Sequence, residues 1–429
     1  MGYANISRRG FLGLMGAIGM SAVLGGCAST DPAAAGMTQI EIVTYKQEAV
    51  EIFKQLQDKF NATHDDIYLK ITCPNDAITI LKTRFIRNNF PDIIGIGGDM
   101  DFSNFLDAGM LADVSDYPGL SQVKPVYIDM LEDLEFVPTE GTYGVPYMAN
   151  AAGIMYNRAL FKEHGWEIPT NWKEFTALCD DIKSQGILPL YFGFKDTWTT
   201  LAPWNALAIE LAPSDVCQLV NEGKTTFTEQ YRSIAERMLE LVPYGEDGPV
   251  AFDYNGACTA FANGQSAMYT IGSYAAPQIL SVNPDMDLDS FVMPGVDNAD
   301  DRVLNSGVDL QFCVMEACPN KEAAYEVLAF LQEHDNIQTY IDAQNAVPCS
   351  EGSFKLPSML DGMLEFIEAG KMADFQDHHY PTEMAVSAQI QTLIIDQDVD
   401  AFLAKFDTDW KRYNRDIIEK VQKYYASQG

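Results

Sequence analysis

The feature that most constrains the fold is a regular alternation of strand-like and helix-like patterns near the start of the folded chain. Residues 40–45 alternate apolar and polar side chains as a strand does, and the apolar residues of 49–60 recur at helical spacing. A strand pattern at 68–72, a helical one at 77–88 and a short apolar strand at 90–96 follow. This β-α-β-α order predicts the α/β class, with a largely parallel sheet whose ligands bind at the carboxyl ends of the strands.

The rest of the chain is too long for one core. Further strands are expected near 267–271, 291–293 and 310–315, and the last hundred residues are predicted to be helical. A chain of 429 residues exceeds the usual size of a single hydrophobic core, so we expect two lobes.

The first residues indicate export. The pair Arg8–Arg9 precedes the uncharged apolar run 11–24, which is shorter than the roughly 20 residues needed to span a bilayer and predicts a signal peptide over 1–26. Two glycines then lead to Cys27, as in a lipobox, so we expect this cysteine to be acylated and to anchor the protein to the outer face of the cell membrane. The small and polar residues 27–36 predict a flexible tether. The paired arginines fit both the general and the twin-arginine export routes.

The charge of the chain excludes some partners. Its formal net charge is −33, so nucleic acid is not expected to bind. An anionic membrane surface also repels such a chain, so a lipid rather than a basic patch must hold it there. The seven cysteines after Cys27 have no regular spacing, so no disulfide framework is legible. The apolar surroundings of several favour buried free thiols, and one or two pairs outside the membrane stay open as the alternative.

No motif in the sequence marks an enzyme or a cofactor site. Gly-x-Ser-x-Gly, Walker A and His-Glu-x-x-His patterns are missing from the sequence. The acidic run 285–289 begins like a calcium loop, but Ser290 replaces the required glycine and Val296 the closing glutamate. His378 and His379 are adjacent, so they point apart and make a poor metal pair. We therefore expect no catalytic residue, no metal and no cofactor.

Three groups of segments share one pattern along nearly the whole chain. They are Phe90-Pro-Asp-Ile-Ile94 with Gly109-Met-Leu-Ala-Asp113; Gly144-Val-Pro-Tyr147 with Ile154-Met-Tyr-Asn-Arg158 and Pro169-Thr-Asn-Trp172; and Phe261-Ala-Asn-Gly-Gln-Ser-Ala-Met268 with Gly272-Ser-Tyr274. In this order and spacing they resemble the extracellular solute-binding proteins of carbohydrate ABC importers, the family that includes maltose-binding protein.

The resemblance implies two α/β lobes joined by a hinge, with a ligand held between them and no covalent chemistry. The implied crossings between the lobes lie near 146–153, 290–296 and 333–345. The implied lobes comprise residues 37–148 with 293–335, and residues 149–292 with 336–429. A monomer that delivers a sugar, and an oligosaccharide in particular, to membrane permease subunits is the function that the resemblance implies.

A sugar site needs aromatic rings for the C–H faces and polar side chains for the hydroxyls. In the first lobe, Tyr45 and Lys46 follow the first strand, and Asp99 and Asp101 follow the strand that ends near residue 96. Polar residues after strands also occur in ordinary loops, so a structural role remains the alternative for these four.

Further candidates lie near the implied crossings. Asn150 and Tyr147 occupy positions that face the cleft in the resembling family, although Tyr147 fits a core position equally well. Asp309 directly precedes the strand expected at 310–315.

The second lobe supplies the aromatic candidates. Asp196 and Trp198 belong to a polar loop, where packing alone does not explain a tryptophan. Trp204 begins an apolar helix, so a buried anchor is its alternative role. Tyr274 stands where the resembling family often has a tryptophan that stacks on a sugar ring.

Three other functions stay open at this stage. The chain has enough Asp and Glu residues to include the two catalytic carboxylates of a glycosidase, so an extracellular carbohydrate-active enzyme is the main alternative. The same fold also serves binding of a non-sugar solute, or a sensor subunit that presents a bound sugar to a receptor.

Overall fold

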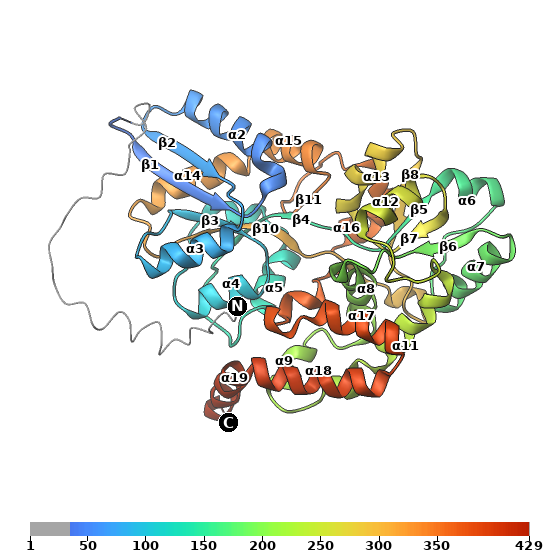
Figure 1. Ribbon diagram of the computed structural model, residues 1–429. Helices are drawn as coiled ribbons and strands as arrows, with labels where there is room; N and C mark the ends of the chain where they lie inside the picture. Colours follow the sequence, from blue (N-terminus) through green and yellow to red (C-terminus); the bar gives the residue numbers. More distant parts are fainter. Residues whose placement is uncertain (1–34, 429) are drawn as a thin grey trace.

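The computed structural model describes residues 35–428 and shows two α/β lobes side by side (Figure 1). This confirms the predicted fold class. The predicted signal peptide, Cys27 and the tether up to residue 34 lie outside the described residues. Within 35–428, no helix combines the length and the apolar character needed to cross a bilayer. The seven cysteines in this part of the chain are all unpaired, and most are buried.

The first lobe is built on a six-stranded sheet whose three N-terminal strands are parallel, as the alternating pattern predicts. Ile and Val residues fill these strands because helices cover both faces of the sheet. In sheet order the strands are β11 (Val347–Pro348), β4 (Val145–Ala149), β10 (Val308–Val314), β3 (Ile93–Ile96), β1 (Thr38–Thr44) and β2 (Ile67–Thr72). The helices of this lobe are α2 (Val50–Thr63), α3 (Ala77–Ile86), α4 (Met100–Asp107), α5 (Pro125–Asp133), α14 (Lys321–Leu331) and α15 (His334–Gln344).

The second lobe has a four-stranded sheet and most of the helices. In sheet order its strands are β6 (Leu188–Tyr191), β7 (Ser266–Tyr269), β5 (Ile154–Asn157) and β8 (Leu288–Phe291). Its helices are α6 (Arg158–His164), α7 (Trp172–Ser184), α8 (Leu201–Leu211), α9 (Val216–Asn221), α10 (Phe227–Gln230), α11 (Arg232–Leu241), α12 (Tyr254–Ala262), α13 (Ala276–Val282), α16 (Leu364–Ala369), α17 (Val386–Asp396), α18 (Val399–Tyr413) and α19 (Arg415–Gln428).

The chain passes between the two sheets three times. It passes first between β4 and β5, then between β8 and β10, where the short strand β9 (Leu304–Asn305) pairs with β12 (Met372–Ala373). The third passage follows β11, because β11 pairs with β4 and α15 packs against α2 of the first lobe. The predicted lobe boundary at 335/336 is therefore wrong, since the segment up to Pro348 still belongs to the first sheet.

The C-terminal helices close one side of the molecule. Aromatic rings hold α18 to the second lobe: Phe227 packs on both Phe406 and Trp410 with ring centroids 4.8 Å apart. Helix α19 turns away from α18 after Asn414 and packs against α9, and its Lys420 forms an ion pair with Asp107 of α4. The last helix therefore connects the second lobe to the first.

Candidate ligand site

A polar cluster forms where β1 ends, around the Asp309 side chain. Lys46 Nζ lies 2.5 Å from Asp309 Oδ2 and 3.1 Å from Glu48 Oε1. Asn150 Nδ2 donates to Asp309 Oδ1 at 2.9 Å, and the Tyr45 hydroxyl donates to the Asp309 backbone carbonyl. The structure thus brings together four residues that the sequence singled out from three distant segments. We call these four, Tyr45, Lys46, Asn150 and Asp309, the Asp309 cluster.

An irregularity in the sheet explains why Asp309 points to its partners. The register between β10 and β4 shifts between Val308 and Leu310, as it does at a β-bulge, which redirects the side chain in between. Burial alone would lower the pKa of Lys46, but the Asp309 carboxylate outweighs this and raises that pKa above its usual value. Lys46 therefore stays charged although it is buried.

Asp99 and Asp101 lie next to the Asp309 cluster at the start of α4. Asp99 is the N-cap of this helix, because its Oδ1 accepts a hydrogen bond from the Asp101 amide at 2.9 Å. Asp101 forms an ion pair with Lys82 at 2.7 Å. Burial raises the pKa of Asp99, with the nearby Asp101 charge as a smaller cause. Both carboxylates thus have structural partners, and contact with a ligand stays a prediction for them.

An aromatic cluster lies on the second lobe. The Trp198 side chain is 42% exposed, and its ring centroid is 4.9 Å from that of Tyr254 and 6.1 Å from that of Tyr274. The loop that carries Trp198 is anchored by its buried neighbour Thr199, whose hydroxyl donates to the Gly193 carbonyl. Asp196 accepts from the Tyr254 amide at 2.9 Å, so it positions the cluster. We call Trp198, Tyr254 and Tyr274 the aromatic cluster.

The two clusters are tied to the same crossing segment. The Asn150 amide donates to Gly307 at 3.2 Å, and Ala152 donates to Asn305 at 2.8 Å. The neighbouring Ala151 carbonyl accepts from the Ser273 amide, directly before Tyr274. A hinge motion of this crossing would therefore move the aromatic cluster relative to the Asp309 cluster.

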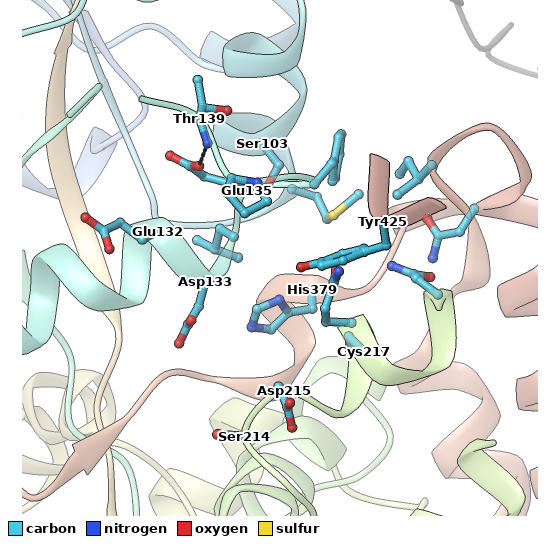
Figure 2. Close-up of a pocket in the computed structure, with 18 of the residues that line it drawn as sticks. Ser103, Glu132, Asp133, Glu135, Thr139, Ser214, Asp215, Cys217, His379 and Tyr425 are labelled. Carbon is cyan, nitrogen blue, oxygen red and sulfur yellow. Dashed lines mark hydrogen bonds between the residues drawn. The ribbon is translucent and has the colours of Figure 1, made fainter. Parts of the chain in front are cut away.

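A separate cavity of about 430 Å³ lies between α4 and α5 of the first lobe and α9, α18 and α19 of the second (Figure 2). Met100, next to Asp99, and His379 line it. The segment that carries His379 also packs on the crossing, because a side chain at Gly307 would collide with Asp374. Sequence analysis missed this cavity and also Tyr254. The cavity lining comes from segments with no shared pattern, and only the position of Tyr254 directly after the Asp253 cap was visible.

Two predicted site residues belong to the cores instead. Tyr147 is 0% exposed and packs between Phe312 and Tyr340. Trp204 is also 0% exposed, and its indole N–H donates to the Tyr380 hydroxyl at 3.1 Å. The prediction that these two rings contact a ligand is therefore wrong.

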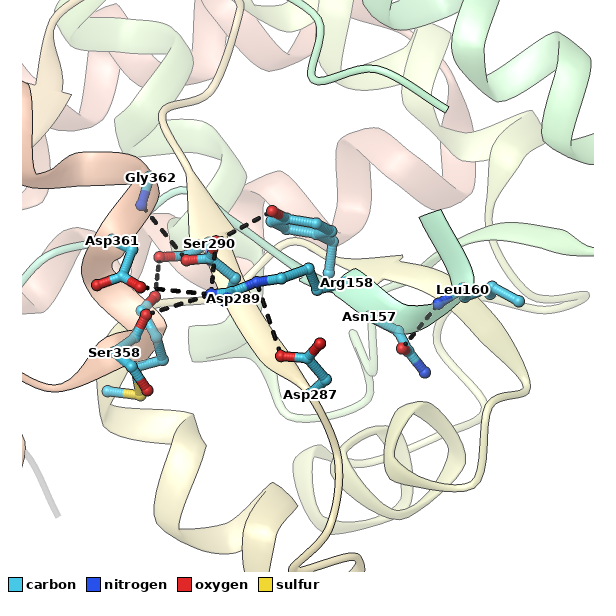
Figure 3. A network of polar contacts seen from close by, with 11 residues as sticks. Asn157, Arg158, Leu160, Asp287, Asp289, Ser290, Ser358, Asp361 and Gly362 are labelled. Carbon is cyan, nitrogen blue, oxygen red and sulfur yellow. Dashed lines mark hydrogen bonds and ion pairs between the residues drawn. The ribbon is translucent and has the colours of Figure 1, made fainter. Parts of the chain in front are cut away.

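The acidic run at 285–289 forms an ion-pair network around Arg158 (Figure 3). The guanidinium lies 2.9 Å from Asp289 Oδ2, 3.7 Å from Asp287 Oδ1 and 3.6 Å from Asp361 Oδ2. This network ties β8 to the start of α6. Within residues 35–428, no group of three or more His, Cys, Asp or Glu side chains is arranged to hold a metal ion.

The family follows from a match over most of the chain. Residues 45–338 match the family described as bacterial extracellular solute-binding protein. The chain belongs to this family. The solute-binding protein is 26% identical to a multiple sugar-binding protein of Streptococcus mutans over 80% of this chain and 83% of that one. It is 22% identical to a probable sugar-binding periplasmic protein of Brucella melitensis, over 81% of this chain and 84% of that one.

Solved structures agree with the fold of the solute-binding protein. The ligand-free form of RafE from Streptococcus pneumoniae superimposes with a TM-score of 0.78 at 21% identity, covering 88% of this chain and 98% of RafE. RafE in complex with raffinose gives a TM-score of 0.72 at 21% identity, covering 88% of this chain and all of the other. At this level of identity the likeness shows the two-lobed fold alone.

Proposed function

We propose that this protein binds a sugar, and an oligosaccharide in particular, between its two lobes and delivers it to an ABC importer. The observation that carries the proposal is the exposed Trp198 ring on one lobe, next to a crossing whose other end holds the Asp309 cluster. An aromatic face and a set of charged hydrogen-bonding groups are what a sugar ring requires. The sugar-binding names of the relatives from Streptococcus mutans and Brucella melitensis support the same ligand class.

The chemistry of the site favours binding without catalysis. The Asp309 carboxylate is held by Lys46 and Asn150, so it is not free to act as a general acid or base. The Lys46 ammonium has three N–H groups and uses two on Asp309 and Glu48, which leaves one for a ligand hydroxyl. Closure of the hinge around the sugar needs only that the sugar binds the closed state more tightly.

The lipid anchor is the second half of the proposal. Acylated Cys27 holds a monomer at the outer face of the membrane, within reach of the permease. Replacing the anchor cysteine, Cys27→Ser, is expected to release the protein from the membrane fraction without altering its affinity for sugar.

A thermal-shift screen tests the function. The protein is heated with mono- and oligosaccharides, with amino acids, polyamines and phosphate esters as controls, and the sugars are checked for cleavage. A rise in melting temperature with sugars and no cleavage product is expected, because a ligand of the native state stabilises it. Cleavage of the sugar would instead establish an enzyme, and a response only to the control compounds would overturn the carbohydrate assignment.

A further inference from the structure

A second exposed aromatic ring lies close to the aromatic cluster in the chain. Three aromatic rings are among the exposed large apolar side chains of residues 35–428: Trp198, Phe252 and Tyr425. Phe252 is 41% exposed and lies two residues before Tyr254 of the aromatic cluster. A single exposed ring needs no explanation, but two of these three belong to the surroundings of the proposed sugar site.

The two exposed rings belong to two loops of the second lobe. The loop 192–198, which follows β6, carries Trp198, and the loop 245–253, which precedes α12, carries Phe252. The Phe252 ring meets the buried Tyr191 ring edge to face, with ring centroids 5.7 Å apart. One side of the Phe252 ring is therefore held by the protein, and the rest of the ring is left to solvent.

Hydrogen bonds at two points join these loops. The buried Glu246 carboxylate accepts from the Phe192 and Gly193 amides, both at 3.0 Å. Further along, the Lys195 amide donates to the Phe252 carbonyl, also at 3.0 Å. The backbone that carries the Phe252 ring is therefore fixed relative to the loop that carries Trp198.

Phe252 continues the succession of rings that starts at the crossing. The Trp198 ring lies between those of Tyr274 and Tyr254, with centroid distances of 6.1 and 4.9 Å. Two residues of chain span at most about 7 Å, so the backbone of Phe252 lies within that distance of the backbone of Tyr254. A chain of sugar units that starts on Tyr274 and Trp198 can therefore reach Phe252.

The neighbours of Phe252 favour a sugar over a protein partner. Lys195 and Asn255 are exposed, and no hydrogen bond or ion pair reaches either side chain within residues 35–428. A surface that binds another protein through apolar contacts needs a continuous apolar patch of several hundred Å². One aromatic face beside free hydrogen-bonding groups is instead what a sugar unit requires.

We propose that Phe252 forms an outer sugar subsite, on which a further unit of an oligosaccharide stacks after the units bound at the aromatic cluster. The proposal rests on the proposed sugar-binding function and names the substrate class, a chain longer than a disaccharide. The inner rings then bind the part of the sugar that short and long chains share, and Phe252 binds only the part that long chains add.

Isothermal titration calorimetry with two series of sugars tests the proposal. The probes are sucrose, raffinose and stachyose, which grow by galactose units, and maltose, maltotriose and maltotetraose, which grow by glucose units. In the series that binds, the longest sugar is expected to bind about fivefold more tightly than the shortest, because it covers the exposed part of the Phe252 ring. Phe252→Ala should remove this gain and leave the affinity for the shortest sugar unchanged. Tyr425→Ala, which removes the exposed ring on α19, is the matched control and should keep the gain.

Phe252→Tyr separates contact with the sugar from positioning of the loops. This variant keeps an aromatic face of similar size, so it should keep the gain in affinity with chain length. An equal loss of affinity for short and long sugars in Phe252→Ala would overturn the outer subsite, because the ring would then act by positioning the aromatic cluster. No gain with chain length in the parent protein, or the same gain in Phe252→Ala, would also overturn it and leave the sugar-binding function standing. Failure to bind any of the sugars would overturn the proposed function itself.

Discussion

The Asp309 cluster and the cavity between the lobes differ in the partners that their carboxylates have. Asp309 is half-buried and meets Lys46, Asn150 and Tyr45, so its charge is satisfied within the chain. Asp133 and Asp215, which line the cavity, are exposed and have no side-chain hydrogen bond or ion pair within residues 35–428, and Lys224, which is paired with Glu222, attracts Asp215 only from a distance. The difference teaches that the carboxylate near the crossing is neutralised within the chain, so that its partner Lys46 keeps an N–H for a ligand, whereas the lining of the cavity keeps a negative charge.

Breaking the paired region should have the largest effect. Asp309→Ala leaves the Lys46 ammonium buried without its main counter-charge, and we expect a loss of about 3 kcal/mol in the free energy of unfolding. Urea denaturation measures it. The double variant Lys46→Met with Asp309→Ala should recover part of the loss, because no uncompensated charge remains. If Asp309→Ala is as stable as the parent protein, the Asp309 cluster does not stabilise the fold.

The Arg158 network allows a buried carboxylate, Asp289, to be compared with an exposed one, Asp287. Asp289 is 5% exposed and relies on Arg158 and the Tyr156 hydroxyl, so Arg158→Met should lower the free energy of unfolding by about 2 kcal/mol. Asp287→Asn is the control: this residue is exposed and 3.7 Å from the guanidinium, so less than about 0.5 kcal/mol is expected. Equal losses in the two variants would mean that burial of the partner does not matter here.

Replacing the exposed Trp198 ring should weaken ligand binding and leave stability unchanged, whereas replacing the paired charged groups should lower stability. Trp198→Ala is expected to weaken sugar binding about tenfold, as measured by calorimetry, because a stacking surface is lost. The melting temperature of the empty protein should hardly change, since the ring is 42% exposed. Tyr274→Ala should weaken binding too, and unfolding of both variants would show that these rings are part of the core.

The smallest expected effect is a pH dependence of stability at Asp133. Burial and the charges of Asp129, Asp374, Glu132 and Asp215 raise the pKa of Asp133 to about 6. Because this pKa is higher in the folded than in the unfolded chain, protonation of Asp133 favours folding, so this residue should contribute a small rise in melting temperature from pH 7 to pH 5. Asp133→Asn removes the titrating group, and the variant should lose this contribution. The same pH dependence in the variant and the parent would contradict the shift.

The local spacing of apolar residues in the sequence predicted the fold class, because the strands of the first lobe are apolar and short and alternate with helices. It predicted the Asp309 cluster in part, because polar residues after parallel strands meet at one edge of a sheet. It was wrong for Tyr147 and Trp204, whose burial depends on rings far away in the sequence, Tyr340 and Phe402 among them. The cavity could not be predicted, because it depends on where α19 turns after Asn414 and on its contact with α4.

Tryptophan fluorescence during a sugar titration tests the central claim most directly, because Trp198 is the exposed member of the five tryptophans and the other four are buried. The account predicts that a bound sugar shifts the emission to shorter wavelength, and that Trp198→Phe abolishes the shift while calorimetry still detects binding. Binding by calorimetry with no change in the emission of the parent protein would contradict it, since the sugar would then lie away from the aromatic cluster.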